Sequence, residues 1–252
     1  MKLTLLSSKI INFINIYLTF GLNLFNFPKS NSIDDEFELF RNKRILIVGS
    51  GPSLKRISSK IIYNYDYIFA INYAIEYLSK FDLKNIYLFS CDTDVIYKIN
   101  KNNLDFQYKT ILIPQQTYNA YKLLKLGLRK NFSLIWPTFE LVKYRSKTFN
   151  ITLPILRVKI ATREELISWL SKKNTSFNLG LMPHSSFFTL VTLLIKKGVV
   201  NIGTIGIDFS KENSSMVGSN YIFSTHGDKE PRDYYKFFEE EILNTFTNYI
   251  KY

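Results

Sequence analysis

A chain of 252 residues, 46% of them hydrophobic, is long enough to bury one sizeable core, and we expect a single α/β domain with short additions. The net charge of +12 favours an anionic partner, but the chain has no block of five basic residues, no zinc-type spacing and no nucleic-acid-binding motif, which argues against DNA or RNA. A single cysteine, Cys91, excludes an internal disulfide and a cysteine-based metal site. It is either a small buried side chain at a strand end or a reactive thiol, in a reducing compartment.

The N-terminal segment is apolar. Residues 10–28 carry no charge, have lysines on both sides and are about long enough to cross a bilayer. Four asparagines within them would be costly in hydrocarbon, so a helix lying at the membrane interface is favoured, with a full span and an ordinary packed helix as alternatives. The sequence thus divides into an apolar segment at 1–30, a linker at 31–43 and a domain at 44–252.

Within the domain, short apolar runs alternate with longer amphipathic stretches, the pattern of βαβ units that build a parallel sheet. The predicted strands are 45–48, 65–72, 85–91, 110–114, 133–137 and 199–209. The predicted helices are 53–63, 163–173, 185–198 and 231–252, with Gly198 ending the third. We therefore expect an α/β fold: a Rossmann-like, mostly parallel sheet flanked by helices, with a short C-terminal lid region before the last helix.

In open parallel sheets, ligands bind at the carboxyl ends of the strands. The first predicted strand ends in a loop made of Gly49, Ser50, Gly51, Pro52 and Ser53. Its glycines permit a tight turn, and the start of the next helix directs N–H groups toward an anion. Leu54 replaces the third glycine of a dinucleotide fingerprint, and Asn72 stands where an acidic residue would bind ribose. A strand-to-helix corner without a ligand is the alternative.

A second polar pattern follows the third predicted strand. Asp92 and Asp94 lie one residue apart, an arrangement that metal-dependent glycosyltransferases use to hold Mn²⁺ or Mg²⁺ against a diphosphate. The alternative is that an aspartate caps a helix beginning near Val95. The metal interpretation would imply a UDP- or GDP-sugar donor, or pyrophosphoryl transfer.

Four blocks carry a resemblance to a known family: "ILIVGSGPSLKRI" (45–57), the strand end at Asn72, "SSFFTLVTLLIKKGVVNIGTIGIDF" (185–209) and "GSNYIFSTHGDK" (218–229). Together they resemble the bacterial sialyltransferases of glycosyltransferase family 42. The first loop is also similar to that of motility-associated nonulosonate transferases and MptE-like pyrophosphokinases. The resemblance runs in pieces from Arg44 onwards and does not extend to residues 101–181.

The resemblance implies a CMP-linked nonulosonic acid donor, a Rossmann-type sheet, and neither a metal nor another cofactor. It implies that the loop from Gly49 to Ser53 holds the CMP phosphate or ribose. The other residues that it assigns to the nucleotide or the substrate are Asn72, Ser185, Ser186, Gly206, Asp208 and Ser210. From the residues alone, the paired serines either cap a buried helix or bind a carboxylate or phosphate. Asp208 either contacts a ligand or caps the next turn.

His226 lies in a polar, glycine-containing loop, and histidine titrates near neutral pH. It is a solvated side chain or a general base for an acceptor hydroxyl, and the resemblance implies the base. The resemblance also implies that Tyr221 stabilises the leaving group. Three features depart from the family: Ser210 stands where a second tyrosine is expected, Ser50 replaces an asparagine, and the segment before His226 is shorter than the usual lid.

The expected function is therefore a metal-independent, inverting glycosyltransferase that moves sialic acid or a related nonulosonic acid from CMP to a cell-surface glycan. Its expected partners are the CMP-activated sugar, a glycan or glycolipid acceptor and an anionic membrane surface. The expected location is cytoplasmic, peripheral at the inner face of the membrane. The sequence leaves a homo-oligomer open. The alternatives are a metal-dependent transferase or pyrophosphokinase using Asp92 and Asp94, and a non-catalytic nucleotide-binding protein.

Overall fold

The centre of the molecule is a seven-stranded sheet in the order β5-β4-β3-β2-β1-β8-β9, and all neighbouring strands are parallel. The computed structural model describes residues 37–91, 95, 99, 108–112, 132–134, 139–145, 152–158, 162–172, 186–208 and 235–252. The strands are β1 (Arg44–Val48), β2 (Tyr67–Ile71), β3 (Ile86–Ser90), β4 (Lys109–Leu112), β5 (Phe132–Leu134), β8 (Asn201–Ile205) and β9 (Asn248–Lys251). The predicted α/β, Rossmann-like fold class is confirmed.

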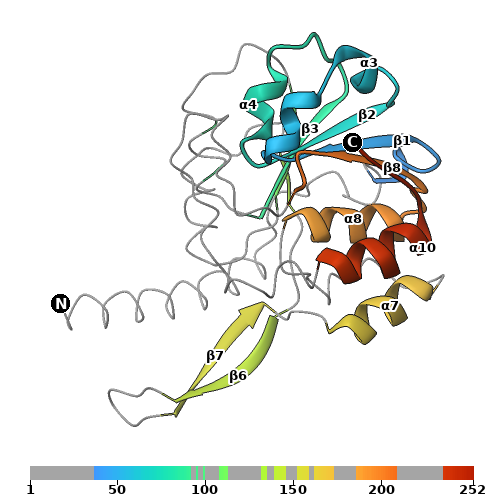
Figure 1. Ribbon diagram of the computed structural model, residues 1–252. Helices are drawn as coiled ribbons and strands as arrows, with labels where there is room; N and C mark the ends of the chain where they lie inside the picture. The colour runs from blue at the N-terminus through green and yellow to red at the C-terminus, as the bar shows by residue number, and fades with distance from the viewer. Residues whose placement is uncertain are drawn as a thin grey trace.

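Helices cover both faces of this sheet (Figure 1). One face carries the 3-10 helix η1 (Pro52–Arg56) and the short helices α3 (Ser59–Ile62) and α4 (Ala74–Leu78). The other face carries α7 (Arg163–Ser171), α8 (Ser186–Lys196), the π-helical segment η3 (Phe238–Leu243) and α10 (Asn244–Phe246). Such a sheet is buried on both sides, which explains why its strands read as continuous apolar runs rather than alternating ones.

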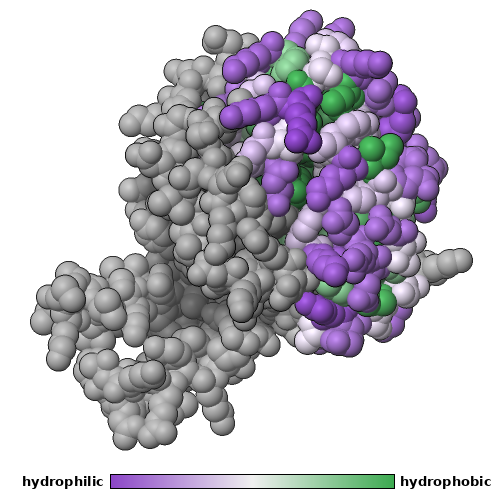
Figure 2. Space-filling model, in the orientation of Figure 1, coloured by the Kyte–Doolittle hydropathy of each residue, from purple (hydrophilic) through white to green (hydrophobic). Residues whose placement is uncertain are grey.

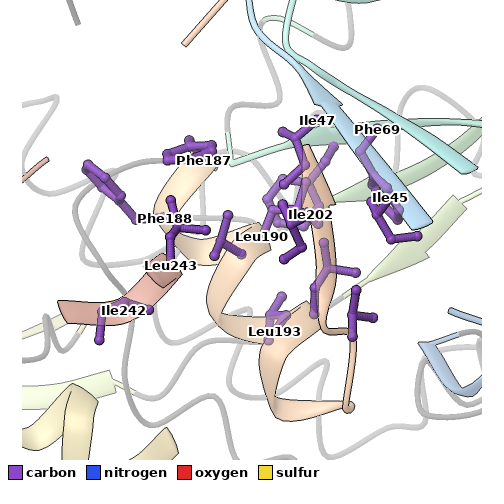
Figure 3. Close-up of a cluster of buried hydrophobic side chains, with 14 of the residues drawn as sticks. Ile45, Ile47, Phe69, Phe187, Phe188, Leu190, Leu193, Ile202, Ile242 and Leu243 are labelled. Carbon is purple, nitrogen blue, oxygen red and sulfur yellow. The ribbon is translucent and has the colours of Figure 1, made fainter. Parts of the chain in front are cut away.

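Alternate residues of β1, β2 and β3 enter two separate cores. Ile45 and Ile47 of β1 pack with α8 and η3, whereas Leu46 and Val48 pack with η1, α3 and α4. Helix α8 is buried at every position from Phe187 to Leu194 because it lies between the sheet and the C-terminal helix (Figure 3). Residues of β1, β2, β3 and β8 therefore share one core with α7, α8 and η3, which come from distant parts of the sequence.

The packed part of the chain begins before Arg44, where the sequence analysis placed the start of the domain. Phe37 and Phe40 are both 0% exposed. The ring of Phe40 makes edge-to-face contacts with Tyr67 and Tyr87, with ring centroids 5.0 Å apart in each pair. Such contacts add to the burial of the rings themselves, so residues from 37 onwards belong to the core rather than to a linker.

The first predicted helix, residues 53–63, is divided in two. The 3-10 helix η1 ends at Ile57, whose extended backbone (φ −62°, ψ 135°) interrupts the helical hydrogen bonds. Ser58 then starts α3, and its hydroxyl accepts a hydrogen bond from the Ile61 N–H. Serine at that position favours a helix start over a helix interior, and this local preference decides the break.

The last predicted helix, residues 231–252, is wrong at its C-terminal end. The helical part gives way to β9 at Thr247, which is extended (φ −141°, ψ 160°). The Asn248 side chain then donates to Asn201 Oδ1 at 3.0 Å, and the Tyr249 and Thr204 hydroxyls lie 2.9 Å apart. The backbone of "NYIK" pairs in parallel with β8 instead of continuing the helix.

A separate two-stranded antiparallel sheet comes from the part of the sequence that the family resemblance did not reach. It consists of β6 (Phe139–Arg145) and β7 (Thr152–Val158), and it projects away from the central sheet (Figure 1). The sequence analysis did not predict this hairpin. Its apolar residues do not alternate strictly with polar ones, so the sequence lacks the clear two-residue period that would predict strands.

The described surface is largely hydrophilic on the face that Figure 2 draws, with hydrophobic residues scattered among polar ones. In the residues that the structure describes, no helix is both long and apolar enough to cross a bilayer. The apolar segment at 1–30 and the predicted lid before the last helix lie outside those residues.

Helix α7 ends against a lysine from α8. Lys196 Nζ donates to the carbonyl oxygens of Trp169 at 2.6 Å and Lys172 at 2.5 Å, and the ammonium lies 4.8 Å from the centre of the Trp169 ring. Burial lowers the pKa of Lys196, and the charge of Lys172 lowers it further. The ammonium thus satisfies carbonyls that a helix end leaves without partners.

Replacing Lys196 with methionine keeps the aliphatic stem and removes these donors. We expect the free energy of unfolding to fall by about 1–2 kcal/mol. Urea denaturation followed by circular dichroism measures the change. The matched control is Lys60→Met on the exposed surface of α3, expected to change stability by less than about 0.5 kcal/mol. Equal losses in the two variants would refute the capping role.

Candidate functional site

The order of the strands locates a candidate site. The chain runs outward from β1 through β2 and β3 to β5, then returns to place β8 on the other side of β1. The connections on either side of the β1–β8 pair therefore leave in opposite directions. This is the topological switch point at which open α/β sheets bind ligands, beyond the carboxyl ends of the strands.

The glycines of the loop after β1 allow its backbone to approach the backbone of the loop after β8 closely. A side chain at Gly49 would collide with the Gly206 carbonyl, and one at Gly206 (φ +72°) would collide with the Gly49 carbonyl. The Gly51 N–H donates to Gly206 O at 2.8 Å, and the Gly49 N–H donates to Ile205 O at 2.8 Å. The glycines are therefore explained by backbone packing across the switch point, before any ligand is considered.

Ser53 and Asp208 complete this contact. The Asp208 carboxylate accepts a hydrogen bond from the Ser53 N–H at 2.8 Å, and the Ser53 hydroxyl accepts one from the Gly206 N–H at 2.8 Å. A protein carboxylate thus occupies the anion position at the start of η1. Asp208 thus caps the start of η1. The turn after Asp208, which the sequence analysis gave as the one that this residue could cap, lies outside the described residues.

The loop retains fewer donors for a phosphate than its sequence suggested. The N–H groups of Gly51 and Ser53 are engaged within the protein, and Pro52 has none. Ser50 is half-buried, and no described residue forms a hydrogen bond with it. A ligand at this corner would therefore meet Ser50 and the remaining carboxylate oxygen of Asp208 rather than a ring of free N–H groups.

A second polar cluster lies at the ends of β2 and β3, and it joins two residues that the sequence analysis selected independently. The Ser90 hydroxyl donates to Asn72 Oδ1 at 2.8 Å. The N–H of the next residue, Cys91, donates to the Ser186 hydroxyl at 3.1 Å. The dipeptide at the end of β3 therefore holds Asn72 of the β2 end and Ser186 of the α8 start.

The chemistry left over at this cluster is that of a hydrogen-bond donor. The carboxamide oxygen of Asn72 accepts from Ser90, and its NH₂ group remains as a donor. The Ser186 hydroxyl accepts from the Cys91 N–H and can still donate its own proton. Asn72 is also held in the left-handed region (φ +53°), which asparagine tolerates better than most residues. Two donors from different elements suit an acceptor group such as a carboxylate or phosphate oxygen.

Ser90 is the residue of this cluster that the sequence analysis missed. It is 0% exposed, between two hydrophobic residues of a buried strand. The available signal was a hydroxyl at the carboxyl end of a core strand, one residue before the cysteine. Cys91 itself is 2% exposed and packs in the core between the sheet and α8, in agreement with the interpretation as a buried side chain.

The remaining predicted site residues are not located. Those that lie outside the described part of the chain are His226, Tyr221, Ser185, Ser210, Asp92 and Asp94. Their roles stay predictions. Among the residues that the structure does describe, no three His, Cys, Asp or Glu side chains come together as a metal site.

Comparisons with known proteins add no relative to this picture. No protein-family model matches the chain, and neither the curated proteins nor the solved structures contain a match.

Proposed function

We propose that the protein is a metal-independent, inverting glycosyltransferase that transfers sialic acid or a related nonulosonic acid from a CMP donor to a glycan or glycolipid acceptor. The observation that carries the proposal is the donor cluster at the carboxyl edge of the sheet, where Ser90 and Cys91 hold Asn72 and Ser186. A CMP-linked nonulosonic acid carries a phosphate and a carboxylate, and both are acceptor groups of the kind that this cluster suits.

In this proposal the loop at the switch point contacts the nucleoside, and not the phosphate that its glycines suggested. Because Asp208 already satisfies the Ser53 N–H, the corner repels a phosphate and attracts a donor. A ribose hydroxyl or the amino group of cytosine would supply such a donor to the Asp208 carboxylate. The nucleoside would then lie at the β1–β8 corner and the anionic groups toward Asn72 and Ser186.

The reaction is a single displacement at the anomeric carbon. His226 removes the proton of an acceptor hydroxyl, the hydroxyl oxygen forms a bond to the anomeric carbon, and the bond from that carbon to the CMP phosphate breaks. CMP leaves with the electron pair, and the proton stays on the imidazole until solvent takes it. The Tyr221 hydroxyl donates to the departing phosphate, whose developing charge must be met by donors already in place.

The acceptor in this proposal resides at a membrane. An interfacial helix in residues 1–30 and the net charge of +12 would bring the protein to anionic lipid at the inner face of the cell membrane. Lipid-linked glycans present their hydroxyls there.

A thermal-shift screen with CMP, UDP, GDP and NAD tests the nucleotide. We expect CMP at about 100 times its dissociation constant to stabilise the protein by about 2.7 kcal/mol, and the other three to have little effect. The Asn72→Ala variant should lose most of the CMP response, measured against its own unliganded melting temperature, which we expect to fall because alanine tolerates a φ of +53° less well than asparagine. Stabilisation by UDP or NAD in place of CMP would contradict the proposal.

A further inference from the structure

The hydroxyl of Ser90 is fully buried, and its contact with Asn72 fixes the carboxamide of that residue. The side chain of Ser90 is 0% exposed, and its Oγ lies 2.8 Å from Asn72 Oδ1. In this pair the serine must donate, because a carbonyl oxygen only accepts. Rotating the Asn72 amide by half a turn would bring an N–H group against the Ser90 hydroxyl, which would then have to accept and redirect its own proton. The observed contact places the carboxamide oxygen toward Ser90 and leaves the NH₂ group directed away from it.

The backbone of Asn72 is held by the same strand. Its N–H donates to Phe89 O at 3.2 Å, and its φ of +53° places it in the left-handed region. A non-glycine residue in that region costs of order 1–3 kcal/mol, and the surrounding structure must impose it. Asn72 is therefore fixed twice by β3, once through its main chain and once through its side chain.

The consequence is chemical. A carboxamide offers an acceptor and two N–H donors, and a free asparagine side chain can present either group to a ligand. The oxygen accepts from Ser90, both N–H groups of the amide remain available, and no described residue accepts a hydrogen bond from them. The half-buried side chain of Asn72 thus presents a donor at the sheet edge.

We infer that Ser90 is a positioning residue that commits Asn72 to recognise a hydrogen-bond acceptor of the nucleotide-sugar donor. The inference rests on the proposed function for the identity of that ligand and deepens it. It assigns a phosphate, carboxylate or ring carbonyl oxygen as the partner of the Asn72 NH₂ group.

A double-mutant cycle measured with CMP tests the inference. Ser90→Ala removes one hydroxyl, and we expect it to weaken CMP binding about five- to tenfold by isothermal titration calorimetry, the worth of one hydrogen bond. Ser90→Thr keeps the hydroxyl and should stay within about twofold of the wild type. In the Asn72→Ala background, Ser90→Ala should cause no further loss. An equal loss in both backgrounds, or no loss in the wild-type background, would overturn the inference.

A second measurement needs no ligand. The side-chain amide resonances of Asn72, identified in a ¹⁵N spectrum by their absence from the Asn72→Asp variant, should shift or broaden in Ser90→Ala and keep their positions in Ser90→Thr. Unchanged resonances in Ser90→Ala would overturn the inference. Failure of the wild-type protein to bind CMP would instead refute the proposed function, and the amide resonances would still decide whether Ser90 orients Asn72.

Discussion

Replacing His226 with alanine is expected to lower turnover about 100- to 10,000-fold, because general base catalysis contributes that much to such a proton transfer. The affinity for CMP should change less than about twofold, since in the proposed reaction the imidazole acts on the acceptor hydroxyl and not on the nucleotide. Release of CMP from a CMP-sugar in the presence of an acceptor measures turnover, and calorimetry measures affinity. The pair of measurements separates an enzyme from a non-catalytic nucleotide-binding protein, which has no turnover to lose.

The chain supplies its own control for this variant. It contains two histidines, and the other, His184, precedes the buried helix α8. His184→Ala should keep turnover within about threefold of the wild type, provided that its circular dichroism spectrum is unchanged. Full turnover in His226→Ala would contradict the proposed role of that residue. Loss of both turnover and CMP affinity would instead make His226 part of the nucleotide site.

Gly206→Ala is expected to lower the free energy of unfolding by about 3 kcal/mol or more. Two costs combine in this variant. The residue has a positive φ of +72°, and the new methyl group would meet the backbone of Gly49, whose carbonyl carbon would lie 2.7 Å away. Backbone atoms in that position move only if the two loops separate. Equilibrium unfolding in guanidinium chloride, with the midpoint and slope fitted together, measures the loss.

Gly198→Ala is the matched control, because it carries one of the two costs. Gly198 ends α8 with a φ of +82°, but a methyl group there would meet only the Arg41 side chain, at 3.5 Å. We expect a loss of about 1–2 kcal/mol from the backbone conformation alone. The difference between the two variants reports the contact of the loops. Equal losses would show that Gly206 is required for its conformation and not for the approach of the backbones.

The strands of the central sheet were predictable because each is a short run of apolar residues bounded by polar ones. β1 and β2 are examples, and their carboxyl ends lie within one residue of the predicted positions. The edge strand β9 was not predictable in the same way. Its four residues follow a helical pattern directly, and only pairing with β8, set by the whole topology, favours the extended conformation.

The candidate site was likewise predictable only in part from the sequence. The sequence identified Asn72 and Ser186 one at a time, from their places at a strand end and a helix start. Their common attachment to β3 depends on which strands are neighbours, and Cys91 and Ser186 are separated by 95 positions. The opposite case is the first loop, where local residues predicted free N–H donors. The aspartate that engages one of them lies in a distant part of the sequence, so local reasoning overestimated the number of free N–H donors.

The same separation has a consequence for how the protein acquires its activity. Ser53 and Asp208 are 155 positions apart, and the strands that precede them, β1 and β8, are neighbours in the sheet. Closing so long a stretch of chain is entropically costly, and topologies of this kind fold slowly. The strands from β1 to β5 can associate during synthesis, before the ribosome has released β8. If the proposed function holds, nucleotide affinity should therefore arise only when β8 docks beside β1, which makes that affinity a sensitive measure of correctly assembled protein.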